Sequence, residues 1–335
     1  MPKNTFWPKK HKDKMPDFEQ QMNRLGRERI PFLFVLDYAL QKPEVVPLSE
    51  VRQDRVLFDV NGLTNAVEKP EGLHGLELKI FPVEKPVYCR AFEKVQNGIH
   101  HGDSFLLNLT MPHKISLNRS LKEVFYLAKA KYKLWFKDKF TVFSPEPFVK
   151  IKDGLIRSFP MKGTMDASLP DAEQRLLSSK KELAEHYTIV DLIRNDLSMV
   201  AGEVTVERFR FIEKVQTHYG ELLQMSSEIK GILPGDYTAH LGTLFKKILP
   251  AGSISGAPKG RTLEIIRDAE QYDRGYYTGV FGIFDGANVD SGVMIRYIEK
   301  QDDGYLYKSG GGITANSNCE EEYDELIKKI YVPLA

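Results

Sequence analysis

The chain has 335 residues, of which 42% are hydrophobic and 28% are charged, as in ordinary globular proteins. These values exclude a disordered, collagenous or coiled-coil chain, and the length allows roughly two domains or one large mixed domain. Lysine and arginine number 47 against 46 aspartate and glutamate residues, and the resulting formal net charge of +1 provides no overall attraction to nucleic acid or to an anionic membrane.

The cysteines and the N-terminal residues indicate the compartment. Cys89 and Cys319 form no Cys-x-x-Cys pair, so we expect neither a disulfide-built secreted fold nor a thiolate zinc site. The N-terminus lacks the apolar segment of a signal peptide, and the chain has no run of 18 or more apolar residues that could span a bilayer. The sequence therefore predicts a soluble, cytoplasmic protein.

Residues 1–28 are polar and basic, and we expect them to form a flexible or surface-lying tail before a single domain over residues 29–335. The β-rich apolar segment 30–38 predicts a buried strand. Further strands are predicted at 76–81, 105–111, 139–143, 148–151, 155–159, 204–211, 226–230, 277–284, 292–299 and 305–309. Helices are predicted at 88–96, 120–131, 170–196, 237–248, 258–269 and 320–330. Because the strands come in consecutive groups with helices between them, we predict an α+β fold with antiparallel sheets.

Two pairs of glutamates have the spacing of a helix face. Glu182 and Glu185 are three residues apart on a predicted helix, and Ser179 stands where a capping residue is expected. Glu322 and Glu325 repeat this spacing on a second predicted helix, which Ser317 or Asn318 could cap. Two such faces brought together would offer four carboxylates, the hard oxygen ligands that Mg²⁺ prefers. The alternative is that acidic residues in the first turns only complement the helix dipoles.

Two glycine-rich segments could let a ligand approach the backbone closely. Residues 252–259, Gly-Ser-Ile-Ser-Gly-Ala-Pro-Lys, precede a predicted helix whose free N–H groups could bind an anion, although a plain tight turn is the alternative. This segment is not a Walker P-loop, because no Gly-Lys-Ser/Thr follows at the required offset. Gly310, Gly311 and Gly312 lie between a predicted strand and the second acidic helix.

Lys162 and His218 are two further candidates for chemistry. Lys162 follows a predicted strand, and a lysine acts as a nucleophile or base only where burial or nearby charge lowers its pKa. His218 is a lone histidine, which fits either a catalytic or a structural role. In the absence of other motifs, a solvated lysine and a structural histidine are the simpler interpretations.

Seven motifs occur in an order that resembles the chorismate-utilising enzymes, the family of anthranilate, aminodeoxychorismate, isochorismate and salicylate synthases. The matching stretches are SPEPF (144–148), MKGTMDA (161–167), KELAEHYTIVDLIRNDL (181–197), GSISGAPKGRTLEII (252–266), RGYYTGVFGIF (274–284), MIRY (294–297) and GGGITANSNCEEEYDELIKK (310–329). Weaker similarity extends upstream through residues 102–110. The resemblance implies one large domain in which antiparallel sheets pack face to face with helices on the outside.

The resemblance also implies roles for individual residues. Those that match the family's Mg²⁺ site, which holds the substrate ring carboxylate, are Glu182, Glu185, Glu322 and Glu325, with Glu185 and Glu325 as direct ligands. Glu146 matches the general acid that helps the C4 hydroxyl leave, a role that needs a raised pKa. His218 matches a catalytic histidine near the leaving group. The residues that match further substrate contacts are Thr164, Tyr277, Arg296, Lys329, Gly310, Gly311 and Gly312.

Two positions distinguish the members of the family. Leu106 stands where isochorismate and salicylate synthases have a lysine that activates water, and leucine cannot do so. Lys162 stands where anthranilate synthases usually have alanine and aminodeoxychorismate synthases have the lysine that attacks C2 of chorismate. The resemblance therefore favours aminodeoxychorismate synthase component I, which makes 4-amino-4-deoxychorismate for 4-aminobenzoate and folate synthesis. The alternatives are anthranilate synthase component I and a non-catalytic chorismate-binding subunit.

The same resemblance implies Mg²⁺ as cofactor and ammonia as second substrate. We expect the metal and a nearby arginine to push Lys162 toward its neutral form. The chain has no glutamine amidotransferase motif, so a separate glutaminase subunit or free ammonia would supply the nitrogen. Met165, Asp166 and Ala167 stand where the family usually has Arg-Pro-Arg, which alters the surface expected to receive a glutaminase.

Overall fold

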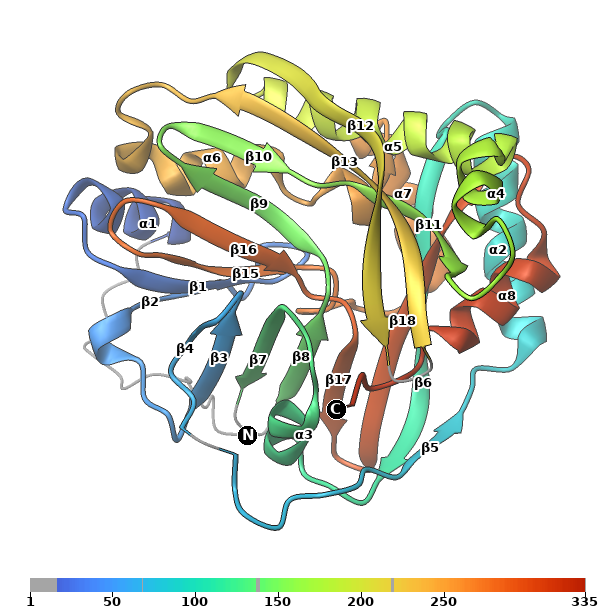
Figure 1. The fold of residues 1–335 in the computed structure, drawn as a ribbon, viewed down its shortest axis with the longest axis horizontal. Helices are drawn as coiled ribbons and strands as arrows, with labels where there is room; N and C mark the ends of the chain where they lie inside the picture. Colours follow the sequence, from blue (N-terminus) through green and yellow to red (C-terminus); the bar gives the residue numbers. More distant parts are fainter. Residues whose placement is uncertain (1–16, 68, 137–138, 218–219, 335) are drawn as a thin grey trace.

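The computed structural model describes residues 17–67, 69–136, 139–217 and 220–334. Over these residues the chain forms two antiparallel sheets of nine strands each, with helices on their outer faces (Figure 1). The predicted α+β fold is confirmed.

The first sheet combines strands from both halves of the chain. Its strands are β1 (Phe32–Leu36), β2 (Glu44–Pro47), β9 (Pro147–Lys152), β10 (Leu155–Ser158), β11 (Met161–Asp166), β12 (Gly202–Thr217), β13 (Gly220–Ile232), β15 (Val280–Phe284) and β16 (Val289–Val293). Their order is β11-β13-β10-β9-β16-β15-β1-β2, and β12 pairs with β13 outside this path. Asp153 and Gly154, both with positive φ, form the tight turn between β9 and β10 that their sequence indicates.

The second sheet carries the glycine run. Its strands are β3 (Val56–Val60), β4 (Leu63–Thr64), β5 (Leu78–Phe81), β6 (Leu106–Leu117), β7 (Tyr132–Phe136), β8 (Phe140–Ser144), β14 (Gly256–Ala257), β17 (Tyr297–Gln301) and β18 (Gly304–Thr314). Their order is β14-β6-β18-β17-β8-β7-β3-β4, with β5 beside β6. Gly310, Gly311 and Gly312 therefore lie inside β18, paired with β6, and not in the loop expected from the sequence.

The two sheets share a core because their strands alternate between two buried faces. In β1, Leu33 and Val35 pack against residues of β3, β7 and β8 in the second sheet. Phe32 and Phe34 of the same strand point to the other face, which is covered by helices. Every residue of β1 is therefore buried, which explains why its sequence is apolar without interruption.

Helices cover the outer faces of both sheets. They are α1 (Phe18–Arg27), α2 (Lys85–His100), α3 (Leu121–Leu127), α4 (Ala172–Ser178), α5 (Lys180–Ser198), α6 (Leu241–Ile248), α7 (Lys259–Glu270) and α8 (Cys319–Lys328), with short 3₁₀ helices η1 (Leu48–Glu50), η2 (Tyr237–His240) and η3 (Gly252–Ile254). α1, α5 and α6 pack on the first sheet, whereas α2, α7 and α8 pack on β6 and β18. Among the described residues, no helix combines the length and apolar character needed to cross a membrane.

Helix α1 lies within the segment expected to be a polar tail. Phe18, Met22 and Leu25 recur at helical spacing and are buried against the core. Asn23 donates a hydrogen bond to the Thr243 hydroxyl of α6 at 2.9 Å, which fixes the polar side of the contact. Residues 18–27 of the expected tail are thus a packed helix of the domain, while residues 1–16 lie outside the described part.

The two cysteines meet although 230 residues separate them in sequence. Cys89 of α2 forms a disulfide with Cys319, the first residue of α8. Tyr323 of α8 also donates a hydrogen bond to the carbonyl of Val83, just before α2, at 2.8 Å. The pairing follows from tertiary packing, because α2 and α8 share one apolar cluster on β6 and β18.

Candidate active site

The two glutamate pairs lie in the first two turns of α5 and α8. Ser179 caps α5 by accepting a hydrogen bond from the N–H of Glu182 at 3.3 Å. Asn318 caps α8 in the same way, accepting from the N–H of Glu320 at 2.9 Å. The sequence thus predicted both helix starts, and each capped first turn sets the direction in which its glutamates project.

Lys162 of β11 points toward the glutamates of α5. Its Nζ lies 3.0 Å from Oε2 of Glu185, and the two side chains are 25% and 12% exposed. Burial alone would lower the pKa of Lys162, but attraction to Glu185, Glu325 and Glu182 outweighs it and raises the pKa. Carboxylates of both helices thus hold this amine as an ammonium ion, and the decrease expected from a bound metal stays a prediction.

Lys329, at the end of α8, makes a second ion pair in the site. Its Nζ lies 2.7 Å from Oε1 of Glu325 and donates a hydrogen bond to the carbonyl of Gly310 at 3.0 Å. Ser317 donates a hydrogen bond from its hydroxyl to Oε1 of Glu322 at 2.8 Å. Burial lowers the pKa of Lys329, against the attraction of Glu325. The second glutamate pair is therefore fixed by polar partners on both sides.

Glycines leave the room in which these charged groups meet. A Cβ added to Gly163 would lie 2.8 Å from Oε2 of Glu182. A Cβ on Gly312 would lie 3.1 Å from Nζ of Lys162 and 3.3 Å from Cδ1 of Leu106. Gly312 thus forms the floor beneath the amine, and Leu106 provides the apolar side of the same position.

The acidic groups of the site have the chemistry to bind a cation. Among the described residues, no three His, Cys, Asp or Glu side chains are grouped closely enough to hold a metal ion. The ammonium of Lys162 instead supplies positive charge among Glu185, Glu325 and Glu182. Glutamate oxygens are the ligand type that Mg²⁺ prefers, so the donor chemistry fits this metal once the carboxylates turn toward it.

Glu146 lies in the link between β8 and β9. Its backbone N–H donates a hydrogen bond to the Ser144 hydroxyl at 3.1 Å, and its carbonyl accepts one from Val293 at 3.1 Å. Burial raises the pKa of the Glu146 carboxyl, while the Ser253 hydroxyl and the positive charges of three neighbouring residues act in the opposite direction. The result is the raised pKa that a general acid needs.

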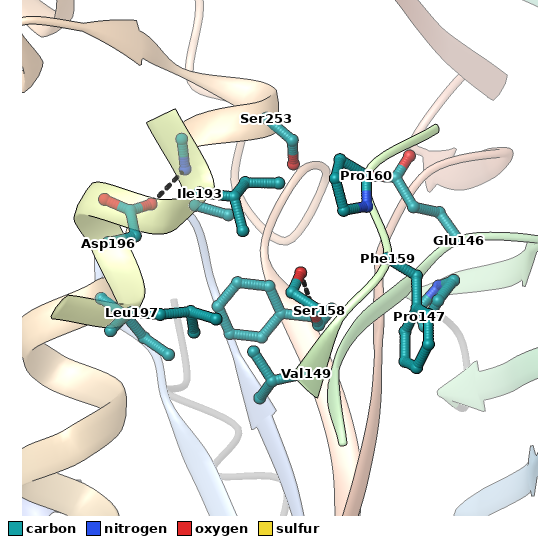
Figure 2. Close-up of a pocket in the computed structure, with 14 residues that line it drawn as sticks. Glu146, Pro147, Val149, Ser158, Phe159, Pro160, Ile193, Asp196, Leu197 and Ser253 are labelled. Carbon is teal, nitrogen blue, oxygen red and sulfur yellow. Dashed lines mark hydrogen bonds between the residues drawn. The ribbon is translucent and has the colours of Figure 1, made fainter. Parts of the chain in front are cut away.

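A cavity of about 20 Å³, the size of a single water molecule, lies beside Glu146 (Figure 2). Ile193, Asp196 and Leu197 of α5 line one side, and Figure 2 shows Glu146 and Pro160 on the opposite side. Ser253 of η3 also lines this cavity. The sequence reasoning missed Ser253, whose signal was its place in the glycine-rich segment.

Arg296 and Tyr277 form the part of the site suited to a carboxylate. Nε of Arg296 is buried and has no hydrogen-bond partner among the described residues. Its guanidinium carbon lies 5.0 Å from the ring centroid of Tyr331, and Tyr277 is 3% exposed. A buried guanidinium N–H without an acceptor is costly, so an anionic ligand that supplied one would be stabilised here.

Comparison with protein families decides the affiliation of the chain. Residues 26–335 match the family described as chorismate binding enzyme. The chain belongs to this family. It is a chorismate-utilising enzyme of the type that includes anthranilate and aminodeoxychorismate synthases, as the seven sequence motifs predicted.

Similar proteins include uncharacterised and named members of this chorismate-binding family. A PabA-like protein of Pasteurella multocida is 50% identical over 318 residues, which are 95% of this chain and 98% of that protein. Aminodeoxychorismate synthase component 1 of Bacillus subtilis is 32% identical over 87% of this chain and 63% of its own length. Anthranilate synthase component 1 of Acetivibrio thermocellus is 32% identical over 74% and 52%. A 2,3-dihydroxybenzoate-specific isochorismate synthase structure from Bacillus anthracis shares the fold, with a TM-score of 0.68, 20% identity and coverage of 92% and 87%.

Two residues assigned from the family motifs stay untested by the structure. His218 lies outside the described residues, and the side chain of Thr164 does so as well. Of the remaining assigned residues, the structure brings Glu182, Glu185, Glu325, Glu146 and Gly312 close to Lys162. Arg296 and Lys329 lie near Glu146, and Tyr277 lies near Arg296 and Glu146.

The glycine-rich segment of this chorismate-binding enzyme is held against α5 by a carboxylate. The anion site suggested at the start of α7 stays a prediction, since the N-cap residue Pro258 makes no side-chain capping hydrogen bond. The N–H of Gly252 donates a hydrogen bond to Oδ2 of Asp196 at 2.9 Å, and Lys259 lies 2.8 Å from Oδ1 of the same carboxylate. The carboxylate that binds the start of this segment is therefore a side chain of α5. The segment serves to attach η3 and the start of α7 to α5.

Proposed function

We propose that the protein is an aminodeoxychorismate synthase component I, which aminates chorismate at C4 with ammonia in a Mg²⁺-dependent reaction. The observation that carries this proposal is the amine of Lys162, placed over Gly312 and among the glutamates of α5 and α8. An amine at this position is a nucleophile that the alanine of anthranilate synthases cannot supply. Leu106, which meets the same Gly312 position, has no group that could activate water.

In the proposed reaction the amine of Lys162 first leaves Glu185 and loses its proton. It then attacks C2 of chorismate, the ring double bonds shift, and the C4 hydroxyl leaves with a proton from Glu146. Ammonia next attacks C4, the double bonds shift back, and the amine of Lys162 leaves C2. Covalent catalysis thus divides one difficult substitution into two allylic steps.

Mg²⁺ would be held by the four glutamates of α5 and α8, where it would bind the ring carboxylate and balance its charge. Arg296 would bind the enolpyruvyl carboxylate through its unpaired Nε–H, with Tyr277 beside it. The backbone of Gly310, Gly311 and Gly312 would contact the substrate from β18, and Lys329 would do so from the end of α8. Thr164 and His218 would complete the contacts.

We further propose that the ammonia comes from a separate glutaminase subunit or from free ammonium. The names of two relatives, which describe them as component 1 of a synthase, support a partner subunit. Anthranilate synthase component I is the second candidate, because a relative of that name is as similar in sequence as the aminodeoxychorismate synthase.

The decisive assay mixes the purified protein with chorismate, Mg²⁺ and an ammonium salt and identifies the product by mass and chromatography. We expect 4-amino-4-deoxychorismate, and Lys162→Ala should lower its rate by about 10³-fold or more. Lys150→Ala is the matched control, because Lys150 is also ion-paired, 3.2 Å from Asp290, but lies outside the site. Anthranilate with pyruvate, or full amination at C4 by Lys162→Ala, would overturn the proposal. Chorismate left unchanged even with a glutaminase present would favour a binding subunit.

A further inference from the structure

A fully buried ion pair lies behind the substrate-binding residues. Arg274 follows α7, and its Nη2 lies 2.6 Å from Oε1 of Glu270, the last residue of that helix. Its Nε donates a second hydrogen bond to Oε2 of Glu270 at 2.8 Å. The side chains of Arg274 and Glu270 are only 2% and 1% exposed. A pair so deeply buried is stable only when its remaining hydrogen-bonding groups are also satisfied.

Arg274 meets this condition completely. Besides Glu270, its Nη1 donates to the carbonyl of Ile254 at 2.9 Å and to Oγ1 of Thr278 at 3.3 Å. Its Nη2 donates to the carbonyl of Asn108 at 2.6 Å. A guanidinium has five N–H donors, so each one has an acceptor here and none is left for a substrate.

The three acceptors other than Glu270 belong to three separate segments of the chain, each next to a residue of the site. Ile254 is the neighbour of Ser253, which lines the cavity beside Glu146. Thr278 directly follows Tyr277 and has a φ of 61°, a backbone conformation that needs support from its surroundings. Asn108 of β6 pairs with Gly312, the floor beneath Lys162. One side chain therefore joins segments that are far apart in sequence.

Glu270 extends the same connection to a fourth place. Its Oε1 accepts hydrogen bonds from the backbone N–H and the hydroxyl of Thr110, at 2.8 and 2.9 Å. Thr110 pairs with Gly310, whose carbonyl accepts from Lys329. The carboxylate is thus bonded to β6 at the point where β18 presents its glycines.

We propose that Arg274, with Glu270 as its counter-ion, is a positioning residue that sets the placement of η3, Tyr277 and β6 around the substrate. It acts through these segments and does not touch the substrate itself. Lysine cannot replace it, because an ammonium has three donors and cannot reach four carbonyl, hydroxyl and carboxylate partners at once. The expected change in KM for chorismate rests on the proposed function. The role of Arg274 in placing these segments can be tested without assuming that function.

Two variants test the proposal, since removal of the whole side chain would leave Glu270 buried and unpaired. Arg274→Lys keeps the positive charge but removes the planar guanidinium group with its five N–H donors. Thr278→Val is milder, because it removes a single hydroxyl, which accepts from Arg274 and donates to the carbonyl of Tyr277 at 2.6 Å. Thr141→Val is the matched control: Thr141 is fully buried and donates from its hydroxyl to the carbonyl of Leu134 at 3.1 Å, away from the site.

The kinetic readout is KM for chorismate, determined from chorismate consumption whatever the product. We expect Arg274→Lys to raise KM by about tenfold or more and Thr278→Val by a few-fold, with Thr141→Val unchanged. A merely structural role would reduce the amount of active enzyme, so the maximal rate would fall while KM stayed the same. That result in both variants would overturn the proposal.

Amide hydrogen exchange provides a second readout that needs no activity. The N–H groups of Ile254 and Ser255 both donate to the carbonyl of Ala251, so their exchange reports on η3. We expect faster exchange over residues 252–256 and 276–279 in Arg274→Lys than in Thr141→Val. Equal exchange in both variants would contradict the proposal, and faster exchange in Arg274→Lys would support it. Both conclusions hold whether or not the proposed reaction is correct.

Discussion

Glu146 and Lys162 show how neighbouring side chains of one site hold protons for different reasons. Burial raises the pKa of the Glu146 carboxyl, which favours the neutral acid. Carboxylates raise the pKa of Lys162, which favours the charged ammonium. In the proposed reaction the neutral Glu146 can donate its proton directly, whereas the ammonium of Lys162 must lose a proton before it attacks C2. The ion pair between Lys162 and Glu185 must therefore break before the proposed reaction can start.

The raised pKa of Glu146 predicts a pH-dependent cost in stability. The ordinary pKa is 4.5, so the folded protein binds an extra proton at this group, and stability falls as pH rises from about that value through the raised folded pKa. We expect Glu146→Gln to have a higher Tm than wild type at pH 8, with the difference shrinking toward pH 4. Thermal unfolding from pH 4 to pH 8 measures this. A Tm difference independent of pH would contradict the prediction.

At the scale of elements, α8 is the helix whose position matters most for the proposed metal site. Asn318 caps its first turn, Ser317 donates to Glu322, and the disulfide between Cys319 and Cys89 attaches its first residue to α2. Gln96 of α2 donates to the carbonyl of Thr314 at 2.9 Å, which holds the segment between β18 and α8. The glutamates of α8 are thus placed by contacts at the start of the helix.

We expect the disulfide to stabilise the fold, because it closes a loop across 230 residues of sequence separation. The variant Cys89→Ser, Cys319→Ser should lose about 2–5 kcal/mol in free energy of unfolding relative to the oxidised protein. Denaturant unfolding measures this loss, and wild type kept in a reducing agent is the control that should match the variant. Two free thiols in the wild type unfolded without reductant would show that the bond is not formed.

At the scale of the whole molecule, the site depends on two sheets packed face to face. Leu33 of β1 is 1% exposed and packs in the core between them, together with Phe58 and Phe281. The first sheet carries Lys162 on β11, and the second carries Gly312 on β18. The relative position of the sheets therefore sets the position of the amine over its floor.

Leu33→Ala should destabilise the protein by about 2–5 kcal/mol, because it removes apolar contacts and leaves a cavity in the core. Leu63→Ala is the matched control, since Leu63 is 50% exposed and its truncation should cost less than about 0.5 kcal/mol. Urea unfolding of the two variants measures both values. Equal losses would mean that the sheet interface is not the core that stabilises the fold.

The sequence by itself determined the features that depend on local spacing. The glutamate pairs, the cap at Ser179, the Asp153-Gly154 turn and the buried segment around β1 follow from periodicity and residue type. The order of the motifs also identified the family, which the family comparison bore out over residues 26–335. Helix α1 carried the same local signal in Phe18, Met22 and Leu25, but the surrounding polar residues obscured it.

Only the tertiary structure decided which of these residues lie together in the site and which protonation states their side chains favour. The pairing of Lys162 with Glu185, the hydrogen bond from Arg274 to Asn108, and the disulfide between α2 and α8 join residues that are 23, 166 and 230 positions apart. A pKa depends on burial and on neighbouring charges in three dimensions, so the direction for Lys162 could not be read from its sequence context. Local sequence specifies helices and turns, whereas long-range packing specifies the electrostatic field in which their side chains act.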